Sequence, residues 1–212
     1  MFAQHDLLLI ASAALSCGFA SAIALPTIVR ARVGRMPEHG ARFDDGQGEL
    51  REDLFDTAVE IDDTVRMMLP QAEETGVALV VDLAPHLPHM RGDQRRIRQI
   101  LLHLLSNALK FTAHGTVTVR AYRVAEGMVV QVNDTGTGMR REDFPKALAP
   151  FGQVSRKYEG AGLDWALTRR MVELHGGYLE LDSVPGQGTS VTVTLPASRL
   201  TVPGNAAAKC AA

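Results

Sequence analysis

The sequence predicts a fold of the α/β class, because segments with the periodicity of amphipathic helices alternate with segments of strand periodicity. The chain has 212 residues, 46% of them hydrophobic, which is enough for one core of domain size and an appended segment. Its formal net charge of −2 gives no reason to expect nucleic acid as a partner. Cys17 and Cys210 lie far apart in dissimilar contexts, which favours a reducing compartment over a disulfide framework or a metal site.

An uncharged apolar run covers residues 7–29. It is long enough to cross the roughly 30 Å hydrocarbon core of a bilayer as a helix. Arg30, Arg32 and Arg35 follow it, and positive residues of this kind stay on the cytoplasmic side. We therefore expect residues 1–35 to anchor the chain in the inner (cytoplasmic) membrane as a single-pass helix, with the remaining chain in the cytoplasm. A cleaved signal peptide and a buried apolar helix are the alternatives.

A linker is expected at residues 36–48, where Pro, Gly and charged residues are mixed without a period. The next segment, 49–72, predicts an amphipathic helix that ends at Pro70 or just before it. Its apolar residues recur at steps of three and four: Leu50, Leu54, Ala58, Ile61, Val65 and Leu69. Strands are expected at 77–83, 116–122, 128–134 and in the last part of 186–196.

A second helix, expected at 93–112, carries two stripes. One stripe is apolar, and the other contains Gln99, His103, Asn107 and Lys110 on a single face. A polar stripe is also typical of an ordinary solvated helix. As a site, however, it has suitable chemistry: Asn107 offers a neutral oxygen to Mg²⁺, His103 can accept a proton, and Lys110 supplies positive charge.

The strand at 128–134 ends in DTGTGM (134–139). A carboxylate at this position, that of Asp134, can accept a hydrogen bond from an amino group such as N6 of adenine. Gly136 and Gly138 lack the Cβ atoms that would block a planar ligand. Because Asp-x-Gly-x-Gly alone is a common turn, its meaning depends on the neighbouring motifs.

A further glycine-rich segment is EGAGLDWALTRR (159–170). Gly160 and Gly162 suit a loop whose backbone approaches phosphate oxygens, and a helix is expected to begin near Asp164. As an N-cap, Asp164 would stabilise that helix by roughly 0.5–2 kcal/mol. The same backbone amides would otherwise receive a phosphate, so the carboxylate of Asp164 is expected to oppose an anion at this site.

Taken in order, the motifs resemble those of the catalytic, ATP-binding domain of bacterial sensor histidine kinases, in the GHKL (HATPase) group that also includes topoisomerase and heat-shock chaperone ATPases. The matching stretches are RQILLHLLSNALKFT (the N box), VNDTGTGM, PFGQV (the F box), EGAGLDWALTRRMVELHGG and GQGTSVTVTLP. The resemblance implies a two-layer α/β sandwich of the Bergerat type at 49–197, with a mixed sheet backed by helices, preceded by the N-terminal apolar helix and followed by a flexible tail at 198–212.

The resemblance also implies ATP and Mg²⁺ as cofactors. Asn107 would ligate Mg²⁺ and Lys110 would meet phosphate. His103 stands at a catalytic position where most sensor kinases have Asn. Gly160 and Gly162 would close a lid over the phosphates.

For the base, the resemblance implies that Asp134 accepts from adenine N6. Gly136 and Gly138 would lie beneath the base, and Thr189 would support it through water. The lid departs from the family's usual Gly-x-Gly-Leu-Gly-Leu, because Asp164 replaces the third glycine. Trp165 replaces the leucine that follows it, and the stretch between the F box and the lid is shorter than usual.

A phosphoacceptor motif, His-Glu/Asp-x-Arg-x-Pro in this family, is not matched by any of the seven histidines. His5 matches only its first residues and is otherwise a histidine flanking a membrane helix. Three functions stay open. The first is a histidine kinase domain that phosphorylates a histidine-containing partner chain in two-component signalling with a response regulator. The second is a degenerate, membrane-tethered pseudokinase that acts as a nucleotide-binding or docking module, and the third is an ATPase that couples hydrolysis to conformation.

Overall fold

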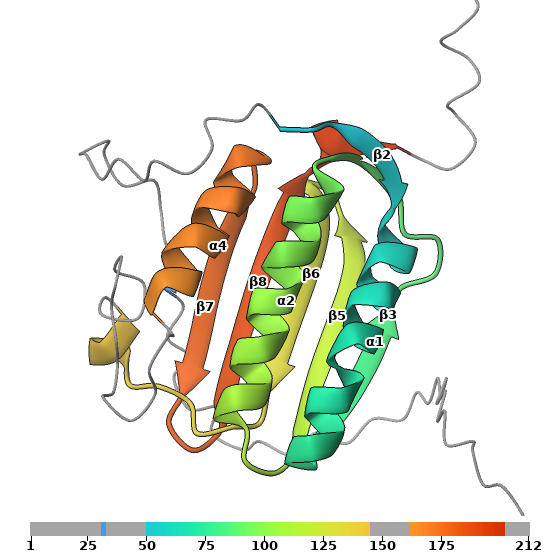
Figure 1. Ribbon diagram of the computed structural model, residues 1–212. Helices are drawn as coiled ribbons and strands as arrows, with labels where there is room; N and C mark the ends of the chain where they lie inside the picture. Colours follow the sequence, from blue (N-terminus) through green and yellow to red (C-terminus); the bar gives the residue numbers. More distant parts are fainter. Residues whose placement is uncertain (1–30, 33–49, 145–161, 202–212) are drawn as a thin grey trace, which may run out of the picture.

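The computed structural model describes residues 31–32, 50–144 and 162–201, which form two layers (Figure 1). One layer is a mixed sheet, and the other consists of three helices that cover one of its faces. The expected two-layer α/β sandwich is therefore confirmed. The apolar run at 7–29 lies outside the described residues, and no helix among those described is long and apolar enough to cross a membrane.

The six-stranded sheet has the order β1-β7-β8-β6-β5-β3, in which β3 pairs parallel with β5 and all other pairs are antiparallel. Its strands are β1 (Ala31–Arg32), β3 (Ala78–Leu83), β5 (Thr116–Val124), β6 (Gly127–Asp134), β7 (Tyr178–Val184) and β8 (Gly188–Pro196). A smaller sheet has the order β2-β4-β9, formed by β2 (Asp53–Asp56), β4 (His89–Gly92) and β9 (Leu200–Thr201). The helices are α1 (Thr57–Thr75), α2 (Gln94–Phe111) and α4 (Gly162–Leu174), with short turns η1 (Arg141–Asp143) and η2 (Ala197–Arg199).

The hydrophobic core lies between the large sheet and the helices. Alternate residues of each central strand point toward the helices, so that Val132, Val191 and Leu181 form one buried row across β6, β8 and β7. Helix α2 covers the middle of the sheet, between α1 and α4 (Figure 1). Its buried side begins at Ile97 and ends at Leu109, directly before the helix terminus at Phe111.

The first helix differs from the expectation at both ends. Residues 53–56 pair with β4 as a strand, and the helix starts after them with Asp56 as its N-cap, whose carboxylate accepts from the backbone N–H groups of Ala58 and Val59. The helix also continues beyond Pro70 to Thr75. Burial of Ala72 in the core, together with a left-handed Gly76 that closes the helix, outweighs the hydrogen bond that proline removes.

The chain remains folded beyond the boundary expected at 197, because Leu200–Thr201 pairs with β4 as β9. Arg199 supports this extension: its Nε donates to the carbonyl of His175 at 2.6 Å and its Nη1 reaches Glu52 at 2.9 Å. At the other end, Ala31–Arg32 falls within the segment expected as an anchor, yet pairs with β7 at the sheet edge. The small sheet, in contrast, joins strands β2, β4 and β9, which come from three distant parts of the chain.

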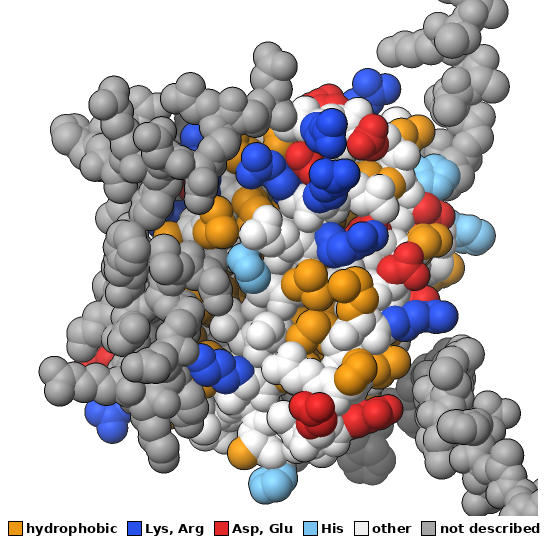
Figure 2. All heavy atoms as spheres, viewed as in Figure 1, with side chains coloured by type: hydrophobic (Ala, Val, Ile, Leu, Met, Phe, Trp, Pro, Cys, Tyr) orange, Lys and Arg blue, Asp and Glu red, His pale blue; other side chains and the backbone are white. Residues whose placement is uncertain are grey.

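Charged side chains connect α1 to α2 near the end of the molecule that carries the small sheet. Glu60 is only 1% exposed, and Arg98 binds its two carboxylate oxygens at 2.7 and 2.9 Å. Figure 2 shows Lys and Arg side chains gathered over this upper part of the visible face. Within the described segments this region includes Arg91, Arg95 and Arg96, the last of which is paired with Asp93. Two arginines of this region, Arg96 and Arg98, are thus paired with carboxylates.

A buried histidine joins the end of α4 to the beginning of α2. His175 is completely buried; its Nδ1 donates to the carbonyl of Met171 at 2.7 Å, and its Nε2 accepts from the backbone N–H of Asp93 at 3.1 Å. Burial lowers the pKa of His175 below its usual range, and the positive charge of Arg199 acts in the same direction. The imidazole is therefore neutral, which is the state that its hydrogen bond from Asp93 requires.

We expect the free energy of unfolding to decrease as the pH falls below about 6.5, the usual pKa of histidine. In that range the unfolded chain takes up a proton on His175 and the folded chain does not, so acid favours unfolding. The slope from this one group approaches about 1.4 kcal/mol per pH unit. Urea denaturation at a series of pH values measures it. His175→Gln, which can both donate and accept without titrating, should flatten the slope, whereas the exposed His114→Gln should not; equal slopes in all three proteins would contradict this assignment.

Candidate functional site

Three polar side chains continue the buried row where the sheet ends. Asp134 on β6 lies opposite Thr189 on β8, and Thr189 lies opposite Ser183 on β7. They occupy the next position on the same face as the core residues of the three strands. This end of the sheet is at the bottom of Figure 1, where α2 also ends.

The carboxylate of Asp134 is fixed by backbone groups. Its Oδ1 accepts from the N–H of Gly136 at 2.9 Å and from the N–H of Thr189 at 3.2 Å. Its Oδ2 has no hydrogen-bond partner among the residues that the structure describes, and neither an arginine nor a lysine from those segments pairs with the group. One oxygen is thus used to orient the side chain, and the other is available to a ligand.

Burial raises the pKa of the Asp134 carboxyl above its usual range, although the hydrogen bonds from Gly136 and Thr189 oppose that effect. A partly buried carboxylate without a cationic partner costs folding free energy. Carboxylates in such an environment are frequent at binding and catalytic sites, where a ligand supplies the missing partner.

The two glycines that follow Asp134 have a structural role that the sequence did not indicate. A Cβ atom on Gly136 would overlap the carbonyl oxygen of Phe111, and one on Gly138, whose φ is +61°, would overlap the carbonyl oxygen of Val184. The protein's own backbone therefore requires glycine at both positions, and their expected role toward a planar ligand stays a prediction. The glycines allow the loop to pass between the end of α2 and the β7–β8 hairpin.

The polar stripe on α2 is present, but its members differ in environment. Asn107 is only 8% exposed, and its amide has no hydrogen-bond partner within the described part of the chain. Lys110 is exposed and its Nζ lies 5.7 Å from the centre of the Phe111 ring. The Nδ1 of His103 is 3.2 Å from the Oγ1 of Thr168, so one ring nitrogen contacts α4.

Helix α4 begins at Gly162, and this corrects the expectation for Asp164. Asp164 is the third helical residue and not the N-cap. Its side chain is not among those that the structure describes. Trp165 is buried in the core, so the tryptophan that replaces the family's leucine is accommodated as a packing residue.

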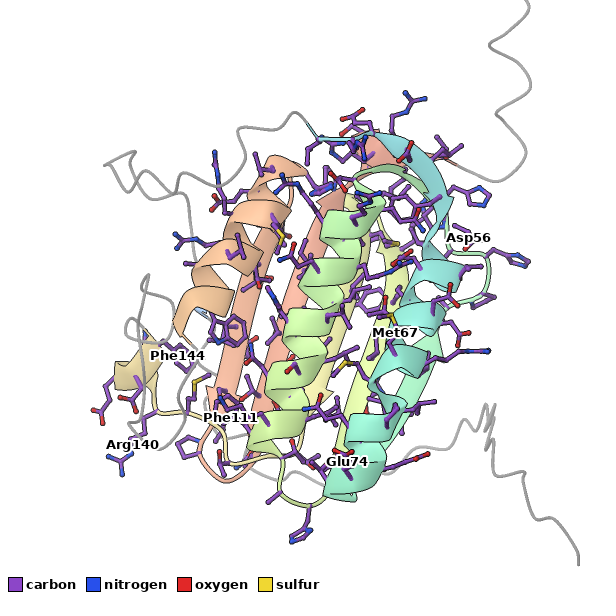
Figure 3. All side chains as sticks on the ribbon, viewed as in Figure 1. Asp56, Met67, Glu74, Phe111, Arg140 and Phe144 are labelled. Atoms are coloured by element: carbon purple, nitrogen blue, oxygen red, sulfur yellow. The ribbon has the colours of Figure 1, made fainter. Side chains whose placement is uncertain are left out.

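Figure 3 shows how the ends of these elements converge. The labelled Phe111, at the end of α2, and Phe144, directly after η1, lie toward the lower left of this view, whereas Met67 and Glu74 on α1 lie further to the right. Gly160 and the F box (PFGQV) fall outside the described residues. The described part of the site thus consists of the Asp134 row, the last turns of α2 and the beginning of α4.

Sequence reasoning did not identify Ser183. Its Oγ contacts the N–H of Met139, the carbonyl of Gly188 and the hydroxyl of Thr189. The available signal was strand alternation, because Ser183 and Thr189 flank a short Gly-containing turn and must face each other if the strands form a hairpin.

A model of the family described as "Histidine kinase-, DNA gyrase B-, and HSP90-like ATPase" matches residues 92–199. Among curated proteins, the chain is 42% identical over 144 residues to the Non-motile and phage-resistance protein of Caulobacter vibrioides, covering 64% of this chain and 17% of that protein. It is 35% identical over 170 residues to the circadian input-output histidine kinase CikA of Synechococcus elongatus, covering 77% and 22%. The chain thus spans about a fifth of the length of these relatives.

Solved structures of histidine kinases have the same fold. The full-length ShkA structure in complex with AMPPNP superposes with a TM-score of 0.67 at 28% identity, over 74% of this chain and 33% of that one. The catalytic domain of histidine kinase ThkA gives a TM-score of 0.62 at 19% identity, over 69% of this chain and 95% of that domain. With the family match extending from the end of β4 to the end of η2, the chain belongs to the family of histidine kinase-, DNA gyrase B- and HSP90-like ATPases.

Proposed function

We propose that this domain binds Mg-ATP and transfers a phosphoryl group to a histidine of a partner chain, as the catalytic domain of a histidine kinase in two-component signalling. The observation that carries the proposal is the carboxylate of Asp134, which is partly buried, fixed by two amides and open at Oδ2. The relatives named as histidine kinases and the AMPPNP complex of ShkA support the same function.

The base would bind at the Asp134 row. An acceptor fixed at one oxygen and free at the other matches an exocyclic amino group, such as N6 of adenine. Thr189 lies directly beside it in the sheet. Because both groups are positioned by backbone pairing, little conformational entropy is lost when the base binds.

The phosphates would bind along the last turns of α2. Asn107 provides a neutral amide oxygen that fits a Mg²⁺ ion held mainly by phosphate oxygens, and no cluster of three acidic, His or Cys ligands occurs in the described segments. When bound, the ion would neutralise charge on the phosphoryl group. Lys110 would contribute a second positive charge, three residues further along the same face.

His103 would take part through its second ring nitrogen. Since Nδ1 contacts Thr168, Nε2 is the atom that could exchange a proton with the phosphoryl acceptor. The same contact connects α2 to α4, whose first residue is Gly162. Gly160 and Gly162 would complete the site as the lid over the phosphates.

A second candidate function is a degenerate nucleotide-binding or docking module without transfer. The observation that favours it is the placement of Asp164 in the first turn of α4. A carboxylate about 4–6 Å from a phosphate oxygen would cost about 3–4 kcal/mol at an effective dielectric near 20, before screening by Mg²⁺ and salt. The two functions share the base site and differ in whether the phosphates are held for transfer.

We also propose that residues 7–29 anchor this domain in the cytoplasmic membrane. The motivation is the uncharged run followed by three arginines. The partner would then be a membrane-associated histidine-bearing chain or its response regulator.

Asp134→Asn should strongly weaken nucleotide binding while leaving the empty domain as stable or more stable. The amide oxygen of asparagine can still accept from Gly136 and Thr189, but its NH₂ group faces the amino group of the base. Loss of this hydrogen bond should weaken Mg-ADP binding by roughly 10- to 100-fold. Calorimetric titration measures the affinity and urea denaturation measures the stability. Asp82→Asn, which removes an exposed carboxylate paired with Arg120, is the matched control and should bind normally.

Retained binding in Asp134→Asn would count against the proposed base site. A large loss of stability would instead show that the carboxylate supports the fold, and the loss of binding would then not be evidence for contact with the base.

Phosphoryl transfer separates the two candidate functions. With radiolabelled ATP, the chain alone should form no acid-labile phosphohistidine at His5, whereas addition of a histidine kinase dimerisation hairpin should yield labelled hairpin. Asp164→Asn removes the charge in the first turn of α4 and should accelerate labelling about fivefold or more. Asp134→Asn is the inactive control. If neither the natural chain nor Asp164→Asn labels the hairpin while both bind ADP, the degenerate module is the correct function.

Fractionation tests the anchor. The full chain should sediment with membranes and resist extraction by high salt, since a spanning helix is held by apolar burial and not by charge. Deletion of residues 1–35 should release the domain. Recovery of the full chain in the soluble fraction would refute the anchor.

A further inference from the structure

The hydroxyl of Ser183 makes three contacts at the edge of the proposed base site. Its Oγ lies 2.7 Å from the backbone nitrogen of Met139, 3.0 Å from the carbonyl oxygen of Gly188 and 3.0 Å from the Oγ1 of Thr189. Ser183 itself lies one strand further from Asp134 than Thr189 does, so its contact with a ligand is not required by the proposed function.

Counting protons fixes the direction of each of these hydrogen bonds. A serine hydroxyl has one hydrogen and two lone pairs. The carbonyl of Gly188 can only accept, so the hydrogen of Ser183 points to it, and the N–H of Met139 can only donate, so it uses one lone pair of Ser183. The remaining lone pair faces Thr189, and the hydrogen of the 3.0 Å contact between the two hydroxyls must therefore come from Thr189.

The consequence concerns the free side of Thr189. With its only hydrogen directed to Ser183, this hydroxyl presents lone pairs alone to anything that binds beside Asp134. The ionised carboxylate of Asp134 is also an acceptor only. The end of the sheet thus offers two adjacent acceptors and no side-chain donor from this row.

We propose that Ser183 is a positioning residue for base selection: it orients the Thr189 hydroxyl as an acceptor, so that the site takes a base with an amino group and rejects one with a carbonyl group at the same position. This inference rests on the proposed function, since it presupposes that a nucleotide base binds beside Asp134. A base whose carbonyl oxygen faces two acceptors leaves all three groups unpaired, which is the costly arrangement in a partly buried site.

The test compares Mg-ADP with Mg-inosine diphosphate, which carries a carbonyl oxygen in place of the amino group. Calorimetric titration of the full chain gives the ratio of the two affinities. In Ser183→Ala the Thr189 hydroxyl is free to rotate and can donate to the carbonyl, so the preference for ADP should fall by about fivefold or more. Ser183→Thr keeps a hydroxyl on a residue that favours strands, so this variant should prefer ADP as strongly as the natural chain does.

The double variant isolates the path through Thr189. In a Thr189→Val background, Ser183→Ala should change the ratio no further, because the hydroxyl that it positions is gone. If Ser183→Ala does not fold, Thr189→Val alone provides the test, and it too should lower the preference for ADP.

The outcomes of these titrations test the role of Ser183 and the proposed function separately. An equal loss of affinity for both nucleotides in Ser183→Ala, or an unchanged ratio in Thr189→Val, would make Ser183 a purely structural residue and overturn the inference while the proposed function stands. Absence of binding by the natural chain to either nucleotide would overturn the proposed function and this inference with it.

Discussion

The carboxylate of Asp134, held by two backbone amides at the end of the buried row, is the constraint on which the site depends. To receive the N–H of Gly136, the chain must turn sharply at the end of β6, and the turn passes so close to Phe111 and Val184 that only glycine fits at 136 and 138. The N–H of Thr189 reaches the same oxygen only because β8 pairs in register with β6. Desolvation of this group costs stability, and the core row beside it supplies the burial that offsets that cost.

Helices α2 and α4 then place the remaining groups relative to that carboxylate. The end of α2 is fixed to the loop after Asp134, since the carbonyl of Phe111 accepts from the N–H of Thr137 at 3.1 Å. The end of α4 is fixed at the opposite pole by His175, which holds the N-cap of α2. The contact between His103 and Thr168 lies between these two points. Helix α4, which begins at the site, is thus fixed at its far end by His175. In the proposed function, the first turn of α4 is the part of this helix nearest the phosphates.

Much of this arrangement could be predicted from the sequence, and the exceptions have physical causes. Helix α2 was expected at 93–112 and spans Gln94–Phe111, because its strong apolar stripe leaves little choice of face. The small sheet was not expected, since β2, β4 and β9 are short and acquire their structure only by pairing with each other. Pro70 was expected to end a helix that local packing carries five residues further. Asp134 was identified by its motif, whereas Ser183 belongs to no motif and could be found only by pairing the two strands of the β7–β8 hairpin.

The base-binding half and the phosphate-binding half of the proposed site therefore differ in how their groups are positioned. The base half is built from paired strands, so its acceptors are positioned before any ligand arrives and contribute their hydrogen bonds with little ordering cost. The phosphate half combines Lys110 with a helix start that carries the acidic Asp164. In the proposed function, each added phosphate would bring negative charge toward that carboxylate as well as toward the lysine, so the opposing electrostatic terms would partly cancel. Under the proposed function, affinity would then come mainly from the base, and the third phosphate would add little to it. Such a balance suits a domain that must release ADP after transfer, because a site that gained most of its free energy from phosphates would retain its product.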